Sequence, residues 1–299
     1  MGIMRIRAAI VIASVATVIA QVLLMAQGGV PPVQSAHGDL KLLKTARDNK
    51  TVPQLWMLHM GMLRGVWEID GVATLELQRS TGTIRVGGQP CILINYRASI
   101  NYQVGGMRVQ YTCTGADGQM RKGIEVVSGQ FAWDEDIVGA ELVPGKGTAT
   151  PNRAALNERL IRLWSGPQGA PKAAVAGGAN TKVTVEGGKT VLTYPIPGVR
   201  GAVAKATLNA GTGDGPCAKN CAERIEVRQG NVLTEFIYAD YEDYNEPLNR
   251  IDAFFPGHIV EKRDGVTILD LSTVETETGN LYVMMPVPAS VRKAWATQP

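Results

Sequence analysis

Three pairs of alternating apolar segments, each joined by a two-residue turn, constrain the fold of this chain more than any other feature. The turns are Gly187-Gly188, Gly230-Asn231 and Asp264-Gly265, whose residues tolerate the positive φ angles of tight hairpins. Alternation with a period of two places one set of side chains on each face of a strand. The chain is therefore expected to form antiparallel hairpins. The segments so joined are Val183–Glu186 with Thr190–Tyr194, Ile225–Arg228 with Val232–Tyr241, and His258–Lys262 with Val266–Val274.

The first half of the chain continues this pattern and is interrupted by one helix. Thr150 is expected to cap that helix, Pro151 to open it and Gly166-Pro167 to end it, with a short continuation over Pro171–Ala176. A terminal helix is expected over Ala289–Trp295. Hairpins with helices inserted at discrete points favour the α+β class over a parallel α/β sheet. The strands expected here are Thr83–Val86, Ile92–Tyr96, Met107–Tyr111 and Ile124–Val127.

Residues 38–66 show a helical repeat ahead of the first strand. Leu55, Leu58 and Met62 recur at intervals of three and four residues, and Pro53 suits a first helical turn. Methionine side chains adapt well to irregular apolar surfaces. This stripe therefore fits either a closed core or a surface that binds an apolar ligand.

The N-terminal residues have the pattern of an export signal. Arg5 and Arg7 precede an uncharged run from Ala8 to Ala26, as in a secretory signal peptide with a cleavage site after Ala26 or near Ala36. The run is also long enough to span a bilayer as an uncleaved anchor. Both alternatives export the rest of the chain to the periplasm, the cell surface or the medium. Membrane contact is expected only through an uncleaved leader.

The charge balance argues against a nucleic-acid partner. Lys and Arg number 30 against 27 acidic residues, and two of the basic residues lie in the leader, so the remaining chain is near neutral. The hydrophobic content of 45% is enough for a sizeable core and excludes wholesale disorder.

The four cysteines form an even set in an exported chain, which predicts disulfides. Cys217 and Cys221 lie in one short loop that a local bridge closes. Cys91 and Cys113 are the remaining pair. A two-residue turn at Gly105-Gly106 places Cys113 opposite Ala98 rather than Cys91, so this second bridge requires a third strand or a bend.

No catalytic constellation is recognisable in the sequence. His37, His59 and His258 are scattered, and the G-x-S-x-G turn of α/β-hydrolases does not occur. Two acidic clusters, residues 133–136 and 240–243, offer a hard-cation site or an acid–base pair, but both fall at expected strand ends, where solvated carboxylates are common. We therefore expect no enzyme activity, no catalytic residue, no metal and no cofactor.

Several short motifs resemble, in their order, an uncharacterised domain of exported bacterial proteins that often precedes a metallo-β-lactamase-fold hydrolase domain. More remotely they resemble the lipoprotein-carrier (Lol) type proteins. Both resemblances imply a strongly curved antiparallel sheet, an unclosed half-barrel, covered by a few helices. The hydrolase domain and its histidines do not occur in this chain, so hydrolase activity does not carry over. The motifs are Ser99-Ile100-Asn101-Tyr102 with Met107-Arg108, Val126–Trp133, Glu158–Trp164, Tyr241–Tyr244, Phe255–Lys262 with Asp270-Leu271, and Met285–Pro288 with Val291-Arg292.

The resemblance implies a binding protein that holds a lipid or a lipoprotein acyl chain between sheet and helices. The alternative is an accessory module that docks to an exported hydrolase or another envelope partner. The expected regions are a signal peptide or anchor over residues 1–36, a helical segment over 37–66 and a half-barrel domain over 67–299 with an inserted helix at 151–165. The expected apolar lining, which fits a closed core equally well, is Leu55, Trp56, Met60, Leu63, Leu160, Leu163 and Trp164.

Overall fold

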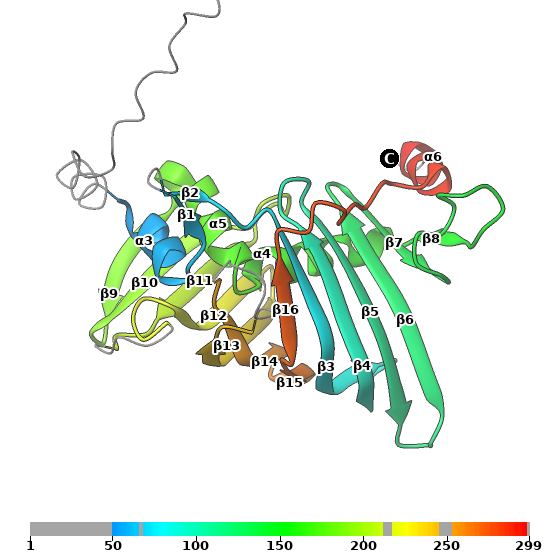
Figure 1. The fold of residues 1–299 in the computed structure, drawn as a ribbon, viewed down its shortest axis with the longest axis horizontal. Coiled ribbons are helices and arrows are strands. Elements are labelled where there is room, and N and C mark those ends of the chain that lie inside the picture. The colour runs from blue at the N-terminus through cyan, green and yellow to red at the C-terminus, as the bar shows by residue number, and fades with distance from the viewer. Residues whose placement is uncertain (1–49, 66–67, 212–216, 245–252, 298–299) are drawn as a thin grey trace, which may run out of the picture. The chain divides into compact units, whose positions relative to one another are not determined.

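The computed structural model describes residues 50–65, 68–211, 217–244 and 253–297. Within them, fourteen strands form one sheet in which all paired strands are antiparallel (Figure 1). The strands of the first half are β3 (Thr74–Val86), β4 (Gln89–Asn101), β5 (Gly106–Gly115), β6 (Met120–Ser128), β7 (Phe131–Glu135) and β8 (Ala149–Pro151). Those of the second half are β9 (Lys182–Glu186), β10 (Lys189–Pro195), β11 (Val203–Leu208), β12 (Ala222–Gln229), β13 (Val232–Glu242), β14 (Phe255–Arg263), β15 (Val266–Ser272) and β16 (Glu275–Thr278).

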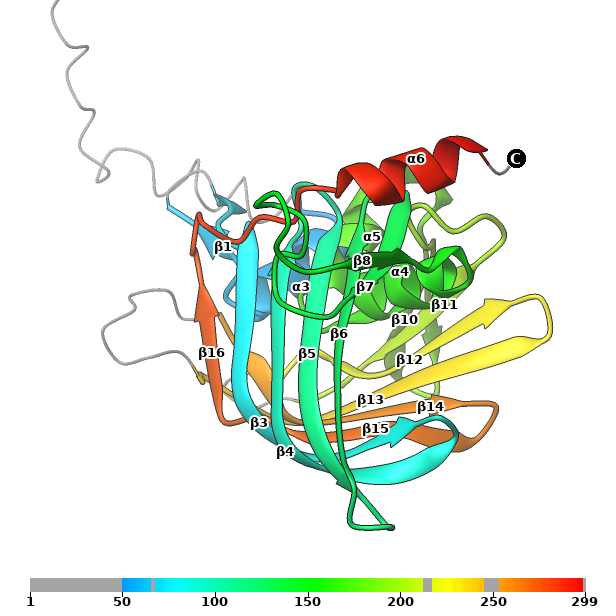
Figure 2. The ribbon, with the colours of Figure 1, turned by 90° about the vertical axis from the view of Figure 1, so that its right-hand side faces the viewer.

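The sheet is open and curved, as the resemblance implied. Its strand order is β8-β7-β6-β5-β4-β3-β15-β14-β13-β12-β11-β10-β9, and β16 pairs with β3 beside this path. Because β8 and β9 do not pair with each other, the sheet does not close into a barrel. Figure 2 shows the two halves of the sheet curving around a common concave side that holds α4 (Leu156–Ser165) and α5 (Gly169–Ala176), whereas the terminal helix lies outside it. A separate two-stranded hairpin consists of β1 (Leu63–Arg64) and β2 (Ile69–Asp70).

The strand β3 joins the two halves of the sheet by bending in its middle. Its first part pairs with β16 and its last part with β15. Arg79 and Gly82 have φ angles of 53° and 129°, and the register with β4 shifts across these residues. A Cβ atom on Gly82 would lie 2.0 Å from the backbone oxygen of Asp270, so glycine is required for this close approach. The bulged region explains why the sequence pattern predicted a strand only from Thr83.

The three predicted hairpins are confirmed. The turns connect β9 to β10, β12 to β13 and β14 to β15, at the predicted two-residue positions. Gly187 and Gly188 both have positive φ, 56° and 79°, which is the backbone of a type I′ turn.

The first described helix, α3 (Val52–His59), is shorter than the predicted helix over 38–66. Pro53 lies in its first turn as expected. The helix ends where Gly61 adopts a φ of 65° and the backbone N–H groups of Gly61 and Met62 donate to the carbonyls of Leu58 and Met57. This is a Schellman C-cap, so Leu63 continues into β1 instead of a further helical turn. The leader, residues 37–49 and Val66 lie outside the described residues.

The inserted helix also begins differently from the prediction. Thr150 and Pro151 belong to β8, and Asn152 is the cap, because its side-chain oxygen accepts the N–H of Ala155 at 3.3 Å. A 3₁₀ turn, η2 (Arg153–Ala155), leads into α4 (Leu156–Ser165), and Gly166 ends that helix as predicted. The continuation is confirmed as α5 (Gly169–Ala176), followed by a second 3₁₀ turn, η3 (Gly178–Asn180).

Helix α4 lies on the concave side and is held by its arginines as well as by its leucines. It contacts β5, β6 and β7 of one half of the sheet and β12 of the other. Arg159 donates to the backbone oxygens of Val126 and Trp133, and the Nε atom of Arg162 lies 2.7 Å from Oε2 of the buried Glu261. An amphipathic pattern alone assigns arginines to solvent, so this inward role was not predicted.

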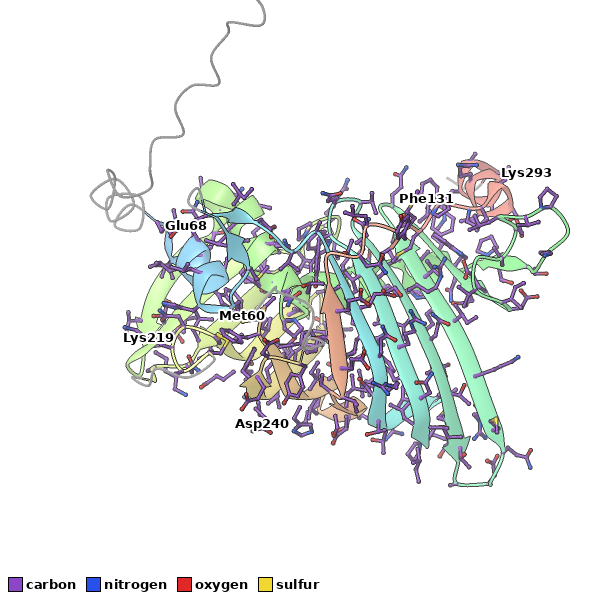
Figure 3. The ribbon with its side chains drawn as sticks, in the orientation of Figure 1. Met60, Glu68, Phe131, Lys219, Asp240 and Lys293 are labelled. Carbon is purple, nitrogen blue, oxygen red and sulfur yellow. A yellow bond between two sulfur atoms is a disulfide. The ribbon has the colours of Figure 1, made fainter. Side chains whose placement is uncertain are left out.

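The opposite face of β6 and β7 carries a second, smaller core. Val126 and Val127 are both fully buried although neighbouring strand residues point to opposite faces. The terminal helix, α6 (Ala289–Thr297), covers Val126 on the convex face with Val291. The side chain of Phe131 lies beside this helix, which carries Lys293 (Figure 3), and its ring centroid is 5.6 Å from that of Trp295.

Both predicted disulfides are present, and no cysteine is free. Cys217 pairs with Cys221, and Cys91 pairs with Cys113. The expectation that Cys113 lies opposite Ala98 was wrong. The turn between β4 and β5 spans four residues, 102–105, and a bulge near Leu93 then places Cys113 opposite Leu93, one diagonal step from Cys91.

Candidate functional site

The seven residues predicted to line a ligand site separate into two groups. Trp56, Met60, Leu160 and Leu163 are almost fully buried in the main core. Leu55, Leu63 and Trp164 are half-buried. The cavity on the concave face beneath the end of α4 has a volume of about 60 Å³, far below the roughly 300–1,000 Å³ of typical ligand sites. Leu63 and Trp164 instead line two larger cavities next to α3 and α5.

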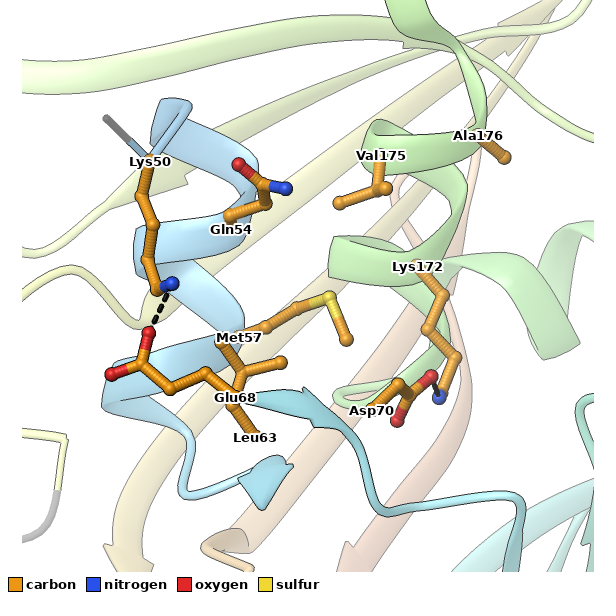
Figure 4. Close-up of a pocket in the computed structure, with 9 residues that line it drawn as sticks. All are labelled: Lys50, Gln54, Met57, Leu63, Glu68, Asp70, Lys172, Val175 and Ala176. Atoms are coloured by element: carbon orange, nitrogen blue, oxygen red, sulfur yellow. Dashed lines mark hydrogen bonds and ion pairs between the residues drawn. The ribbon is translucent and has the colours of Figure 1, made fainter. Parts of the chain in front are cut away.

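These two cavities share three lining residues, Asp70, Lys172 and Ala176, and together we call them the helical groove. The first has a volume of about 300 Å³ and the second of about 460 Å³. The first is lined by Lys50, Gln54, Met57, Leu63, Glu68, Asp70, Lys172, Val175 and Ala176 (Figure 4). The second is lined by Asp70, Ala73, Tyr102, Gln103, Trp164, Lys172, Ala176 and Pro197.

The groove forms because short elements with different directions pack side by side. Helix α3 contacts α5, and α5 contacts both α4 and β10. The β1–β2 hairpin follows the glycine cap of α3, and the N–H of Gly71 donates to the carbonyl of Met62 at 2.8 Å. One carboxylate oxygen of Asp70 accepts the N–H of Val72 at 3.0 Å, which fixes the position of its side chain at the groove.

Two ion pairs flank the apolar middle of the first cavity. Lys50 pairs with Glu68 at one side and Lys172 pairs with Asp70 at the other, with Met57 between them (Figure 4). The Lys172 side chain is only 10% exposed, whereas that of Asp70 is 40% exposed. Burial lowers the pKa of Lys172, and its interaction with Asp70 offsets this only in part.

Tyr102 forms the wall of the second cavity beside Lys172. The Nζ atom of Lys172 lies 5.1 Å from the Tyr102 ring centroid, within the range of a cation–π contact. Trp164 packs against the same ring at a centroid distance of 6.2 Å. The buried hydroxyl of Tyr102 has no hydrogen-bond partner among the described residues. Burial, and then the nearby Asp70 carboxylate, raise the pKa of this hydroxyl.

Sequence reasoning missed the polar residues of the groove. Asp70, Tyr102 and Lys172 come from three separate segments. Tyr102 ends one of the motifs that carry the resemblance, but that motif assigned it no role, and Asp70 and Lys172 belong to no motif. One signal was available: Lys172 is the single charged residue of α5, whose sequence is otherwise small and apolar. A lone charge in such a helix indicates a specific partner.

The carboxylates of the first acidic cluster, residues 133–136, make structural contacts, and the second cluster, residues 240–243, lies at the end of β13. Asp134 pairs with Arg159, and Glu135 pairs with Arg108 at 3.2 Å. The two described histidines also have polar neighbours. The Nε2 atom of His258 lies 2.7 Å from Oδ1 of Asp270, and the Nδ1 atom of His59 lies 3.1 Å from Nδ2 of Asn220. Within the described residues, no group of three or more histidine, cysteine or acidic side chains is placed to hold a metal ion. His37 lies outside the described residues.

No family model matches this chain, and no curated protein matches it. Across the described ranges, no helix has the length and apolar character needed to cross a membrane. The two disulfides indicate an oxidising compartment outside the cytoplasm.

Proposed function

We propose that this protein is a non-enzymatic binding protein of the periplasm or cell surface that holds the apolar chain of an amphiphilic ligand in the helical groove. The observation that carries the proposal is the pair of adjoining cavities, each within the usual size range of ligand sites. The proposal keeps the apolar ligand predicted from the resemblance. It moves the site from the concave face to the groove beside α3 and α5.

The walls of the groove suit an acyl chain. Met57, Leu63 and Val175 line the first cavity, and Trp164 and Pro197 line the second. Burial of one methylene group contributes about 0.8 kcal/mol, so each added carbon is expected to tighten binding roughly fourfold until the groove is full. Methionine and flat aromatic rings adapt to a flexible chain without specific hydrogen bonds.

A blocking substitution tests this site. Ala176 lies on the surface where the two cavities meet, and Ala176→Trp is expected to fill the groove. Ala296→Trp on the exposed side of α6 is the matched control. Binding of fatty-acid probes with eight to sixteen carbons is measured by fluorescence displacement, together with mass spectrometry of organic extracts of the purified protein.

We expect affinity to rise with chain length and to fall at least tenfold in Ala176→Trp but not in Ala296→Trp. Absence of any uptake by the unmodified protein, or equal uptake by both variants, would overturn the proposal.

A separate observation favours the second candidate, an accessory module for an exported hydrolase. Three large apolar side chains lie exposed between β16 and α6: Leu281, Tyr282 and Met284, with exposures of 80%, 92% and 65%. Apolar side chains clustered on a surface often mark a protein contact. Co-purification of a hydrolase that is lost when all three are changed to serine would support this candidate, and retention of that hydrolase would contradict it.

A further inference from the structure

We propose that the helical groove selects amphiphiles with an anionic oxygen head group, a carboxylate or a phosphate, which Lys172 and Tyr102 bind in place of Asp70. This inference rests on the proposed function and names the ligand class of the same site. It is carried by an enclosed lysine and an exposed aspartate that meet where the two cavities join, and by a tyrosine of the second cavity whose hydroxyl has no partner among the described residues.

The first step of the argument is the unequal burial of the ion pair. Lys172 is fixed on α5 and enclosed by the groove, with the Tyr102 ring on one side. Asp70 belongs to the two-residue strand β2, whose residues are both exposed. An enclosed cation needs a nearby anion, whereas an exposed carboxylate is readily solvated by water. Asp70 is therefore the partner that a ligand anion can replace.

The second step is the kind of polar group that the site leaves without a partner. The Tyr102 hydroxyl is a donor that has no acceptor among the described residues, and the Lys172 ammonium has three donor hydrogens. Both groups are complemented by an anion with two or three oxygen atoms. A cationic head group would have to compete with Lys172 for Asp70 and would leave the tyrosine hydroxyl unpaired.

The third step is the path that the apolar chain of the ligand takes through the groove. A head group at Lys172 lies at the boundary of both cavities, so the attached chain can run along the Met57 and Leu63 wall or along the Trp164 and Pro197 wall. The charged end thus lies where the groove is polar, and the chain lies where it is apolar.

The contribution of the head group to binding is measured with probes that have the same chain length and different head groups. These are dodecanoate, dodecanol and dodecyltrimethylammonium, with dodecyl phosphate as a second anion. Binding of each probe to the full-length protein is measured by calorimetry. Lys172→Met keeps the length of the side chain without its charge, and Asp70→Asn removes the competing carboxylate. Tyr102→Phe removes only the hydroxyl. Lys189→Met, at an exposed ion pair with Glu223 outside the groove, is the control.

We expect dodecanoate or dodecyl phosphate to bind at least tenfold more tightly than dodecanol. We expect Lys172→Met to abolish that difference, Asp70→Asn to raise anion affinity severalfold, and Tyr102→Phe to lower it. Equal binding of dodecanol and both anions would overturn the inference while leaving the proposed function standing, whereas no binding of any probe would overturn both. If Lys172→Met does not fold, Asp70→Asn decides: unchanged or weaker anion binding contradicts the inference.

Discussion

Single residues of this protein are fixed by buried polar contacts that a hydrophobic pattern does not reveal. Glu135 is the clearest example. Its carboxylate accepts from Trp133 Nε1 at 2.9 Å and from the backbone N–H of Gly139 at 2.8 Å, in addition to its ion pair with the buried Arg108. The acidic cluster at 133–136 thus contributes to structure, and its buried carboxylate, that of Glu135, ties β7 to β5 and to the following loop.

Removal of the Glu135 carboxylate is expected to destabilise the folded protein. Glu135→Ala leaves the Arg108 charge buried without its partner, which typically costs about 3–5 kcal/mol of unfolding free energy. Glu186→Ala removes the partner of Lys205 in a solvent-exposed ion pair, so the unfolding free energy is expected to change little. Urea denaturation of both variants measures these differences. Equal destabilisation by the two substitutions would contradict the structural role of Glu135.

His59 is expected to make stability depend on pH. Burial, and then the positive charge of Lys219, lower the pKa of His59 below its usual 6.5. Below pH 6.5 the unfolded chain therefore takes up a proton more readily than the folded chain, so the folded state loses stability as the pH falls through the lowered pKa. Urea midpoints at pH 7.5 and 5.0 are compared between the unmodified protein and His59→Gln. The unmodified protein should lose more stability on acidification, and an equal loss in both would refute the prediction.

At the scale of elements, the turn between α4 and α5 determines how the helices fit the sheet. A Cβ atom on Gly169 would lie 2.1 Å from the carbonyl oxygen of Leu163 and 3.3 Å from the Tyr102 ring, so the helices meet more closely than any other residue allows. The Tyr238 hydroxyl donates to the carbonyl of Ser165 and fixes the end of α4 to β13. The groove depends on this turn, because Trp164 and Lys172 lie on its two sides.

Gly169→Ala is therefore expected to destabilise the protein by about 1–3 kcal/mol, the usual cost of overpacking. Gly166→Ala is the matched control, because its Cβ atom would lie 3.3 Å from the same carbonyl, a contact that a small shift relieves. Thermal unfolding and probe binding are measured for both. We expect Gly169→Ala to lower both the thermal stability of the protein and its affinity for the fatty-acid probes. If Gly169→Ala lowers them less than Gly166→Ala does, the close packing at Gly169 is contradicted.

At the scale of the whole molecule, the two disulfides stabilise different lengths of chain. The Cys91–Cys113 bridge spans 22 residues and the Cys217–Cys221 bridge spans 4. In the chain-entropy description, a longer closed loop restricts the unfolded chain more.

Replacement of both cysteines of a bridge by serine is expected to lower the free energy of unfolding. The expected loss is about 3 kcal/mol for Cys91–Cys113 and about 2 kcal/mol for Cys217–Cys221. Urea denaturation of the two double variants, with and without a reducing agent, checks this order. A larger loss at the shorter loop would show that native contacts around Cys217, and not loop length, dominate.

The sequence by itself determined the hairpins, the α+β class, the last residue of α5 and the first residue of α6, because turn residues and alternation act between near neighbours. Gly187-Gly188 specifies its turn whatever the rest of the chain does. Only the tertiary structure decided the inward role of Arg162, the bend of β3 at Gly82 and the groove. Asp70, Tyr102 and Lys172 are brought together by the packing of α5 against α3 and beside the curved sheet, and such contacts between distant segments leave no periodic trace in the sequence.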